Sequence, residues 1–287
     1  MNSIRVCLNG EYYTVSGKIF SGGEIHVNLS HIDIPHPTQC FIKCHLQSSD
    51  DIMLLFMTVD ALRQKYAKLV VDTVCIPYFP YSRQDRVCAP GDAFSLQVFA
   101  NMLKINGINN VYTYDMHSNS GLQSLYHACI NVIVHDTIYV FNGNRVLLDL
   151  VKNPNILICA PDKGAYNKTR QLVDYFRKKD QPFVVGEKQR DPTSGALTGF
   201  KYQYDQSIVD KDICIVDDIC DGGGTFVGLA NVLLADGAKS VSLYVTHGIF
   251  SRGLDVFDGV ISHVYTTDSF RTDIKSTDKV KLTVIHI

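Results

Sequence analysis

The chain has 287 residues, of which 46% are hydrophobic and 20% are charged, and its formal net charge is -2 at pH 7. These values are typical of a globular protein and exclude a generally basic nucleic-acid-binding protein. No run approaches the ~18 uninterrupted apolar residues of a membrane-spanning helix, so we expect neither a nucleic-acid nor a membrane partner.

The nine cysteines indicate a reducing compartment. Their odd number excludes complete internal pairing, and no two of them have the C-x-x-C spacing. Cys75, Cys159 and Cys214 lie in apolar runs, where a thiol behaves as a small hydrophobic side chain. The first residues also lack an apolar stretch long enough for a signal peptide. We therefore expect a cytoplasmic protein with reduced thiols.

Short buried strands alternate with helical patterns along most of the chain. After ~35 residues of short strands broken by glycines, the strand candidates are Cys40–Leu46, Leu69–Pro77, Asn110–Tyr114, Asn155–Ala160, Phe183–Gly186, Ile213–Asp217 and Ser240–Thr246. The helical patterns cover Asp50–Ala67, with Asp50 as N-cap, and Phe94–Ile105, Tyr166–Lys178 and Thr225–Ala235. This alternation favours an α/β architecture with mainly parallel sheets flanked by helices.

An internal repeat predicts two domains. Ser95–His117 and Thr225–His247 align without gaps and share seven identities in 23 positions. Each segment reads as a helix, a glycine C-cap, a strand and a histidine just after the strand. We expect two similar domains, residues 1–140 and 141–287.

The segment Ile213–Thr225 carries the strongest chemical signal. An apolar strand ends in Asp217 and Asp218, and Asp221 and three glycines follow before a helix opens at Thr225. Glycines let backbone N–H groups turn towards an anion, and a helix N-terminus favours negative charge there. The pattern predicts a phosphate site beside acids that could bind sugar hydroxyls. The structural alternative is an ordinary strand–turn–helix joint with a solvated acid pair.

This segment resembles the ribose-phosphate loop of the type I phosphoribosyltransferase fold. Five further motifs narrow the resemblance to the ribose-phosphate pyrophosphokinases: FSGGEIHV (20–27), PYFPYSRQDR (77–86), YDMHS (114–118), APDKG (160–164) and VTHGIFS (245–251). They occur in the family's order and span nearly the whole chain.

The resemblance implies an activity and an assembly. It implies an enzyme that transfers the pyrophosphoryl group of MgATP to O1 of ribose 5-phosphate, giving 5-phosphoribosyl 1-pyrophosphate and AMP. It also implies two phosphoribosyltransferase-like domains, of which the first contributes to ATP binding and the second binds ribose phosphate. The family likeness further implies Mg²⁺ as cofactor and homodimers built into a hexamer.

The resemblance also implies roles for individual residues. ATP would be bound by Phe20, Glu24, Arg83, Gln84, Arg86 and His117. Ribose 5-phosphate would be bound by Asp217, Asp218, Asp221, Gly222, Gly223, Gly224 and Thr225. His117 and Asp162 would hold the metal, and Lys188 and Arg190, at the start of a loop expected to act as a lid, would be catalytic.

Four positions depart from the family pattern, one of them Ala165, which stands where glycine is common. Gly22 replaces an acid or amide, Lys163 replaces a small residue, and Gln189 replaces a basic residue. Two alternatives therefore stay open. A phosphoribosyltransferase that consumes the activated sugar would explain the Asp217–Thr225 loop but not the RQDR motif or the second domain. A catalytically inactive regulatory homologue would be expected to lose Lys188, Arg190 or the acid pair, all of which are present.

Overall fold

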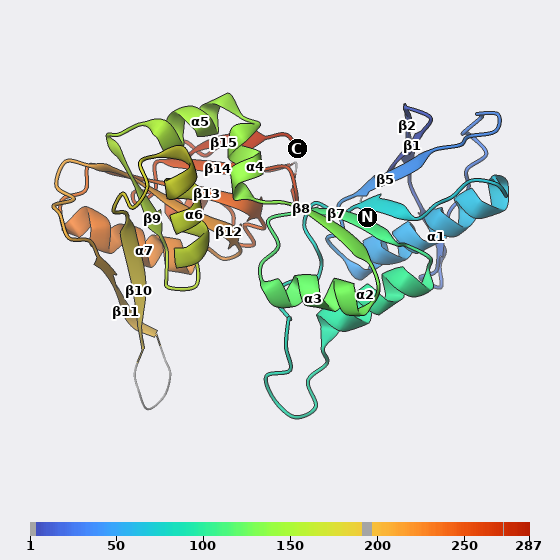
Figure 1. Cartoon of the computed structure of the whole chain (residues 1–287), viewed down its shortest axis with the longest axis horizontal. Helices are drawn as coiled ribbons and strands as arrows, with labels where there is room; N and C mark the ends of the chain where they lie inside the picture. Colours follow the sequence, from blue (N-terminus) through green and yellow to red (C-terminus); the bar gives the residue numbers. More distant parts are fainter. Residues whose placement is uncertain (1–3, 191–196, 272) are drawn as a thin grey trace. The chain divides into compact units, whose positions relative to one another are not determined.

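The computed structural model describes residues 4–190, 197–271 and 273–287, and the chain divides into two compact units, Met1–His135 and Asp136–Ile287 (Figure 1). The division lies slightly before the expected boundary at residue 140, which would fall within the helix Thr137–Asn142. Each unit has its own buried apolar cluster. The two units are therefore described separately.

The first unit is built on a six-stranded sheet of order β2-β1-β5-β6-β7-β8. The strands are β1 (Ile4–Leu8), β2 (Glu11–Val15), β5 (Cys40–Cys44), β6 (Thr73–Cys75), β7 (Asn110–Tyr114) and β8 (Asn131–His135). The pairs β1–β2 and β1–β5 are antiparallel, and the remaining pairs are parallel. A small antiparallel hairpin of β3 (Lys18–Ile19) and β4 (Ile25–His26) stands apart from this sheet.

Three helices connect the parallel strands of the first unit: α1 (Ser49–Lys65), α2 (Ser95–Ile105) and α3 (Asn119–His127). Each crossover moves in the same direction along the sheet, and right-handed crossovers then place all three helices on one face. Buried residues of all three join one core cluster. The N-cap of α1 is Ser48, not Asp50 as the sequence suggested, because the Ser48 hydroxyl accepts from the Asp51 N–H while the Asp51 carboxylate accepts from that hydroxyl.

The second unit contains a seven-stranded sheet of order β11-β10-β9-β12-β13-β14-β15. Its strands are β9 (Ile156–Ala160), β10 (Val184–Arg190), β11 (Leu197–Gln203), β12 (Asp212–Cys220), β13 (Ser240–Gly248), β14 (His263–Thr267) and β15 (Lys281–Ile285). Among the strand pairs in the described residues of this unit, the β10–β11 hairpin alone is antiparallel. The helices are α4 (Thr137–Asn142), α5 (Arg145–Lys152), α6 (Tyr166–Phe176) and α7 (Gly224–Ala235), with one 3-10 turn at Asp255–Phe257.

The strand order of the second unit reverses between β9 and β12. The chain passes from β9 through α6 to β10 on one side, and later from β12 through α7 to β13 on the other. Open α/β sheets bind ligands in the crevice outside the carboxyl ends of the strands at such a reversal. The topology thus predicts a binding site where β9 and β12 end.

The structure confirms the predicted fold class, with two mainly parallel sheets flanked by helices. The repeated segments correspond to α2–β7 in the first unit and α7–β13 in the second. Gly107 and Gly237, which end the two helices, both have left-handed backbone conformations with φ of +71° and +93°. No helix in the described part of the chain is both long and apolar enough to cross a membrane.

Close packing of β10 against the end of β9 makes Gly186 intolerant of a side chain. A Cβ at Gly186 would lie 2.4 Å from the carbonyl oxygen of Pro161 and 2.8 Å from Leu229 Cδ2. We predict that Gly186→Ala lowers the free energy of unfolding by about 1–3 kcal/mol, the usual cost of overpacking. Gly143→Ala is the control, because its Cβ would make only ordinary contacts at 3.5 Å. Denaturant unfolding of both variants would measure the difference, and equal stabilities would contradict the packing described.

Candidate functional site

The connection between β12 and α7 forms a tight turn at the reversal point of the second sheet. Gly223 is the N-cap of α7 and has φ +77°, a conformation that favours glycine. Its carbonyl accepts from the N–H groups of Phe226 and Val227, both at 3.0 Å. A helix N-terminus presents further N–H groups to an anion. Gly224 and Thr225 begin the helix, one residue earlier than predicted.

A second segment braces this turn. The N–H of Ile249 donates to the carbonyl of Cys220 at 2.9 Å, and the N–H of Ser251 donates to that of Asp221 at 3.2 Å. These residues belong to the VTHGIFS motif, which begins inside β13 and continues just beyond the end of that strand. The motif therefore has a structural explanation, since it fixes the backbone on which Asp221 and Gly222 are carried.

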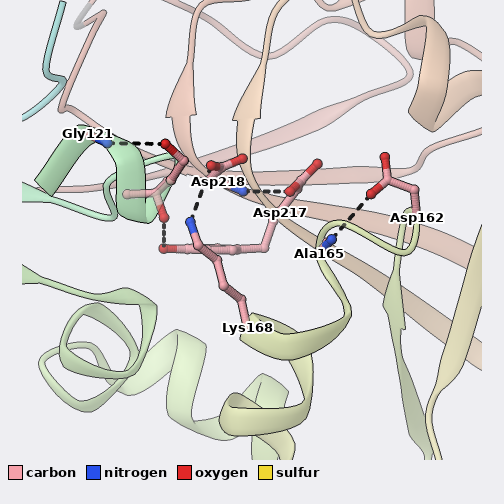
Figure 2. A network of polar contacts seen from close by, with 9 residues as sticks. Gly121, Asp162, Ala165, Lys168, Asp217 and Asp218 are labelled. Carbon is pink, nitrogen blue, oxygen red and sulfur yellow. Dashed lines mark hydrogen bonds and ion pairs between the residues drawn. The ribbon is translucent and has the colours of Figure 1, made fainter. Parts of the chain in front are cut away.

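The acid pair lies inside β12, because this strand continues to Cys220 and does not end at Asp217 as predicted. The Asp218 N–H donates to Asp217 Oδ1 at 3.0 Å, and the Lys168 ammonium lies 3.3 Å from Asp218 Oδ2 (Figure 2). Burial and the negative charge of Asp218 raise the pKa of Asp217 well above its usual range.

Asp162 follows β9 and is bound from two sides. Its Oδ1 accepts from the N–H groups of Gly164 and Ala165, at 2.9 and 3.3 Å (Figure 2). Its Oδ2 lies 2.8 Å from the ammonium of Lys188 in β10. Burial would raise the pKa of Asp162, but Lys188 and the two amides outweigh it, and the pKa is lowered. The structure thus brings one expected metal residue and one expected catalytic residue into direct contact.

In the first unit, four of the six expected ATP residues line one polar cavity of about 560 Å³. The loop after β6 contributes Arg83, Gln84 and Arg86, and His117 comes from the segment after β7. Arg86 donates to both oxygens of the buried Asp85, at 2.9 and 3.2 Å. That interaction, with Ser118 and the charge of His117, lowers the pKa of Asp85 despite its burial. The cavity therefore combines the Asp85 carboxylate, which is hydrogen-bonded by Arg86, with arginine side chains at its surface.

The remaining two expected ATP residues, Phe20 and Glu24, flank the β3–β4 turn and do not line that cavity. The Gly23 N–H donates to the Phe20 carbonyl, and the Phe20 ring packs on His26 with 5.7 Å between centroids. A Cβ at Gly22 would lie 2.5 Å from Glu24 Oε2, so the missing side chain leaves room for the Glu24 carboxylate. A side chain at position 22 would therefore compete with the Glu24 carboxylate for the same space.

No group of three or more His, Cys, Asp or Glu side chains suited to a metal ion is found among the described residues. The two expected metal residues belong to different units, His117 to the first and Asp162 to the second. Mg²⁺ commonly binds through one or two carboxylates, water and substrate phosphates, so a protein-only cluster is not required. The ammonium on Asp162 Oδ2 shows that this oxygen already stabilises a cation.

Two basic residues near the loop were not identified from the sequence. Lys168 lies in α6 and pairs with Asp218, and Arg252 lies close enough to Gly222 that a Cβ there would be 3.5 Å from its Nε. Both follow recognised motifs by a few residues, but neither motif includes them. Arg190 ends β10, and its side chain, like residues 191–196 of the expected lid, lies outside the part of the structure described.

The raised pKa of Asp217 predicts a specific pH dependence. The folded protein retains this proton at pH values where an unfolded aspartate, with a pKa of about 3.9, has lost it, so stability falls as pH rises above that value. Asp217→Asn should therefore stabilise the protein at pH 7, because the amide carries no charge for burial and Asp218 to disfavour. The gain should disappear towards pH 4.

Asp162→Asn is the matched control for this experiment. The pKa of Asp162 is lowered, so its contribution is present at neutral pH and is lost as pH falls. This variant should be destabilised at pH 7 and should approach wild type in acid. Calorimetry between pH 4 and 8 would measure both trends, and parallel curves for the two variants would contradict the assignment.

Comparison with known proteins agrees with this arrangement. Residues 1–107 match the family described as the N-terminal domain of ribose phosphate pyrophosphokinase. A ribose-phosphate pyrophosphokinase of Granulibacter bethesdensis is 30% identical over 90% of this chain and 77% of its own length. The enzyme of that name from Mycoplasmopsis pulmonis is 28% identical over 91% and 78%. The crystal structure of phosphoribosylpyrophosphate synthetase from Mycobacterium smegmatis shares the fold, with a TM-score of 0.75 and 21% identity over 95% of this chain and 86% of that one. The chain belongs to the ribose-phosphate pyrophosphokinase family.

Proposed function

We propose that this protein transfers the pyrophosphoryl group of ATP to O1 of ribose 5-phosphate. In this reaction the anomeric hydroxyl oxygen attacks the β-phosphorus of ATP, and the bond from that phosphorus to the α–β bridging oxygen breaks. AMP leaves with the bridging oxygen, the hydroxyl loses its proton, and 5-phosphoribosyl 1-pyrophosphate is formed. The observation that carries the proposal is the turn at Gly223, which opens a helix N-terminus beside two carboxyl groups at the reversal point of the sheet.

Ribose 5-phosphate fits the second unit by its chemistry. The 5-phosphate would accept hydrogen bonds from backbone N–H groups of Asp221–Thr225 and from the Thr225 hydroxyl, with the helix dipole adding to the attraction. The side chain of Arg252 lies beside Gly222 and supplies a cation near the same loop. Asp217 and Asp218 would take the vicinal hydroxyls of the ribose.

ATP fits the polar cavity of the first unit. Its phosphates would contact Arg83 and Arg86, whose planar guanidinium groups match phosphate oxygens. Gln84 and His117 would supply further hydrogen bonds from the same cavity. Phe20 and Glu24 would contact the adenine of a neighbouring subunit, which requires self-association as dimers within a hexamer.

Mg²⁺ would be held by Asp162 and, through water or phosphate, by His117. When bound, the ion supplies positive charge that neutralises the phosphate oxygens. The chain's own contribution is the Asp162 carboxylate, which the Gly164 and Ala165 amides orient. Lys188 pairs with the same carboxylate, so the site would combine this ammonium with the positive charge of the ion.

Lys188 and Arg190 would act on the transferring group. Phosphoryl-type transfer depends on positioning and charge neutralisation more than on covalent chemistry. A lysine that starts 2.8 Å from Asp162 is already close to the carboxylate proposed to hold the metal. Lys188 would thus stabilise the charge that develops as the bond to AMP breaks.

Two other functions fit fewer observations. A phosphoribosyltransferase would use the loop at Gly223 but would leave the cavity at Arg83 and the whole first unit without a role. An inactive regulatory homologue would not need the contact between Lys188 and Asp162. Both alternatives are distinguished from the proposed reaction by whether AMP is released.

The activity is tested by AMP release with Lys188→Ala as the comparison. Wild-type protein with MgATP should release AMP only when ribose 5-phosphate is present. Lys188→Ala should lower kcat by ~10²–10⁴, the effect of removing a preorganised charge, while the KM values change much less. A coupled spectrophotometric assay measures both. The proposal would be wrong if no AMP were released, or if AMP release did not depend on ribose 5-phosphate. If Lys188→Ala raised only the KM values, Lys188 would be a binding residue and not a catalytic one.

The phosphate loop is tested at Gly224. Gly223 has a φ of +77°, and a Cβ there would lie 3.0 Å from the Phe257 ring. A substitution at Gly223 would therefore disturb folding, and its effect on phosphate binding could not be measured separately. A Cβ at Gly224 meets nothing within 4 Å, and its φ is not positive. Gly224→Val should therefore keep the wild-type melting temperature but raise the KM for ribose 5-phosphate by about tenfold or more, because the anion can no longer approach the N–H groups. An unchanged KM would place the 5-phosphate elsewhere.

A further inference from the structure

Two consecutive residues of β10 are paired with two consecutive residues of the β9–α6 connection. Lys188 Nζ lies 2.8 Å from Asp162 Oδ2, and Lys163 Nζ lies 2.9 Å from Glu187 Oε1. Each segment contributes one acid and one base. A shift of β10 by one residue in one direction would bring Lys188 towards Lys163, and a shift in the other direction would bring Glu187 towards Asp162. Either shift brings like charges together, and like charges repel. The charge pattern therefore allows one relative position of the two segments.

The two ion pairs lie just beyond the point where the backbone pairing between β9 and β10 ends. The last parallel pair between β9 and β10 is Ala160 with Val185. Beyond it, side chains rather than ladder hydrogen bonds connect the two segments. Glu187 and Lys188 are neighbours in a strand, so their side chains leave it on opposite faces. The pairs thus hold the end of β10 from both sides.

Glu187 links three segments through its two carboxylate oxygens. Its Oε1 takes Lys163 from the β9–α6 connection, and its Oε2 lies 3.2 Å from Lys201, directly opposite in β11. The pair with Lys201 lies within the hairpin. The pair with Lys163 ties the hairpin to the connection that carries Asp162.

We propose that Lys163 is a positioning residue: by pairing with Glu187, it holds β10 where the Lys188 ammonium contacts the Asp162 carboxylate. The inference rests on the proposed function in one respect, namely that Lys188 acts on the transferring group. The Lys163 side chain is 71% exposed, and an ion pair so exposed stabilises a fold very little. Its effect is on geometry, and small displacements of a reacting group change rates strongly.

The first test measures the reactivity of Lys188 directly and does not depend on enzyme activity. Substrate-free protein is labelled with a trace of acetic anhydride, and acetylation of Lys188 is measured by mass spectrometry. In Lys163→Ala, Lys188 should react at least about threefold faster, the scale set by losing an exposed pair. Lys163→Arg keeps the charge and should restore the wild-type rate. Lys201→Ala removes a partner of the same Glu187 without loosening the hairpin from Asp162, so its Lys188 should stay within about twofold of wild type.

The second test measures kcat, the two KM values and the melting temperature of the same variants. Lys163→Ala should lower kcat by about tenfold, with both KM values and the melting temperature close to wild type, because misplacement costs rate and not binding. Unchanged Lys188 labelling in Lys163→Ala, or an equal increase in Lys201→Ala, overturns the positioning role. The expected labelling in a protein that never forms AMP would leave the positioning role intact and reject the proposed function instead.

Discussion

The reversal of strand order between β9 and β12 is the constraint on which the site in the second unit depends. Because β9 pairs in parallel with both β10 and β12, the carboxyl ends of all three strands meet at one edge of the sheet. The residue after β9, the end of β10 and the acids of β12 are therefore brought together although they are far apart in the chain. The helix that follows β12 then begins at the same edge and adds an N-terminus suited to phosphate.

The acids gathered at this edge are tolerated for different physical reasons. Asp162 is neutralised by Lys188 and two amides, which lowers its pKa, and Asp218 has Lys168 within 3.3 Å. Asp217 has the opposite shift, since burial and Asp218 make its charged form unfavourable. The network in Figure 2 thus contains carboxyl groups with contrasting proton affinities, which is common where a protein binds or transforms a polar ligand.

The two units carry related architecture with different consequences. Both contain a helix, a glycine with positive φ and a strand, at Gly107 and Gly237. In the first unit the strand order does not reverse between β5 and β8, and the polar cavity is formed by the loops after β6 and β7. A shared supersecondary unit has therefore produced a phosphate-type turn in one half and an arginine-lined cavity in the other, because ligand sites depend on the loops and not on the scaffold.

The sequence alone determined the α/β class, the repeated helix–glycine–strand unit and the position of the glycine turn before α7, because periodicity and glycine placement are local properties. It also grouped Arg83, Gln84 and Arg86, which are neighbours in one loop. It missed β8, β11, β14 and β15, which are stabilised by pairing within their sheets, and it ended β12 too early at Asp217. Tertiary structure alone decided that Lys168 meets Asp218, that Lys163 contacts Glu187 and that Lys188 contacts Asp162. Those contacts depend on the order and register of strands that are distant in the chain, and no local pattern specifies which charged side chains will meet.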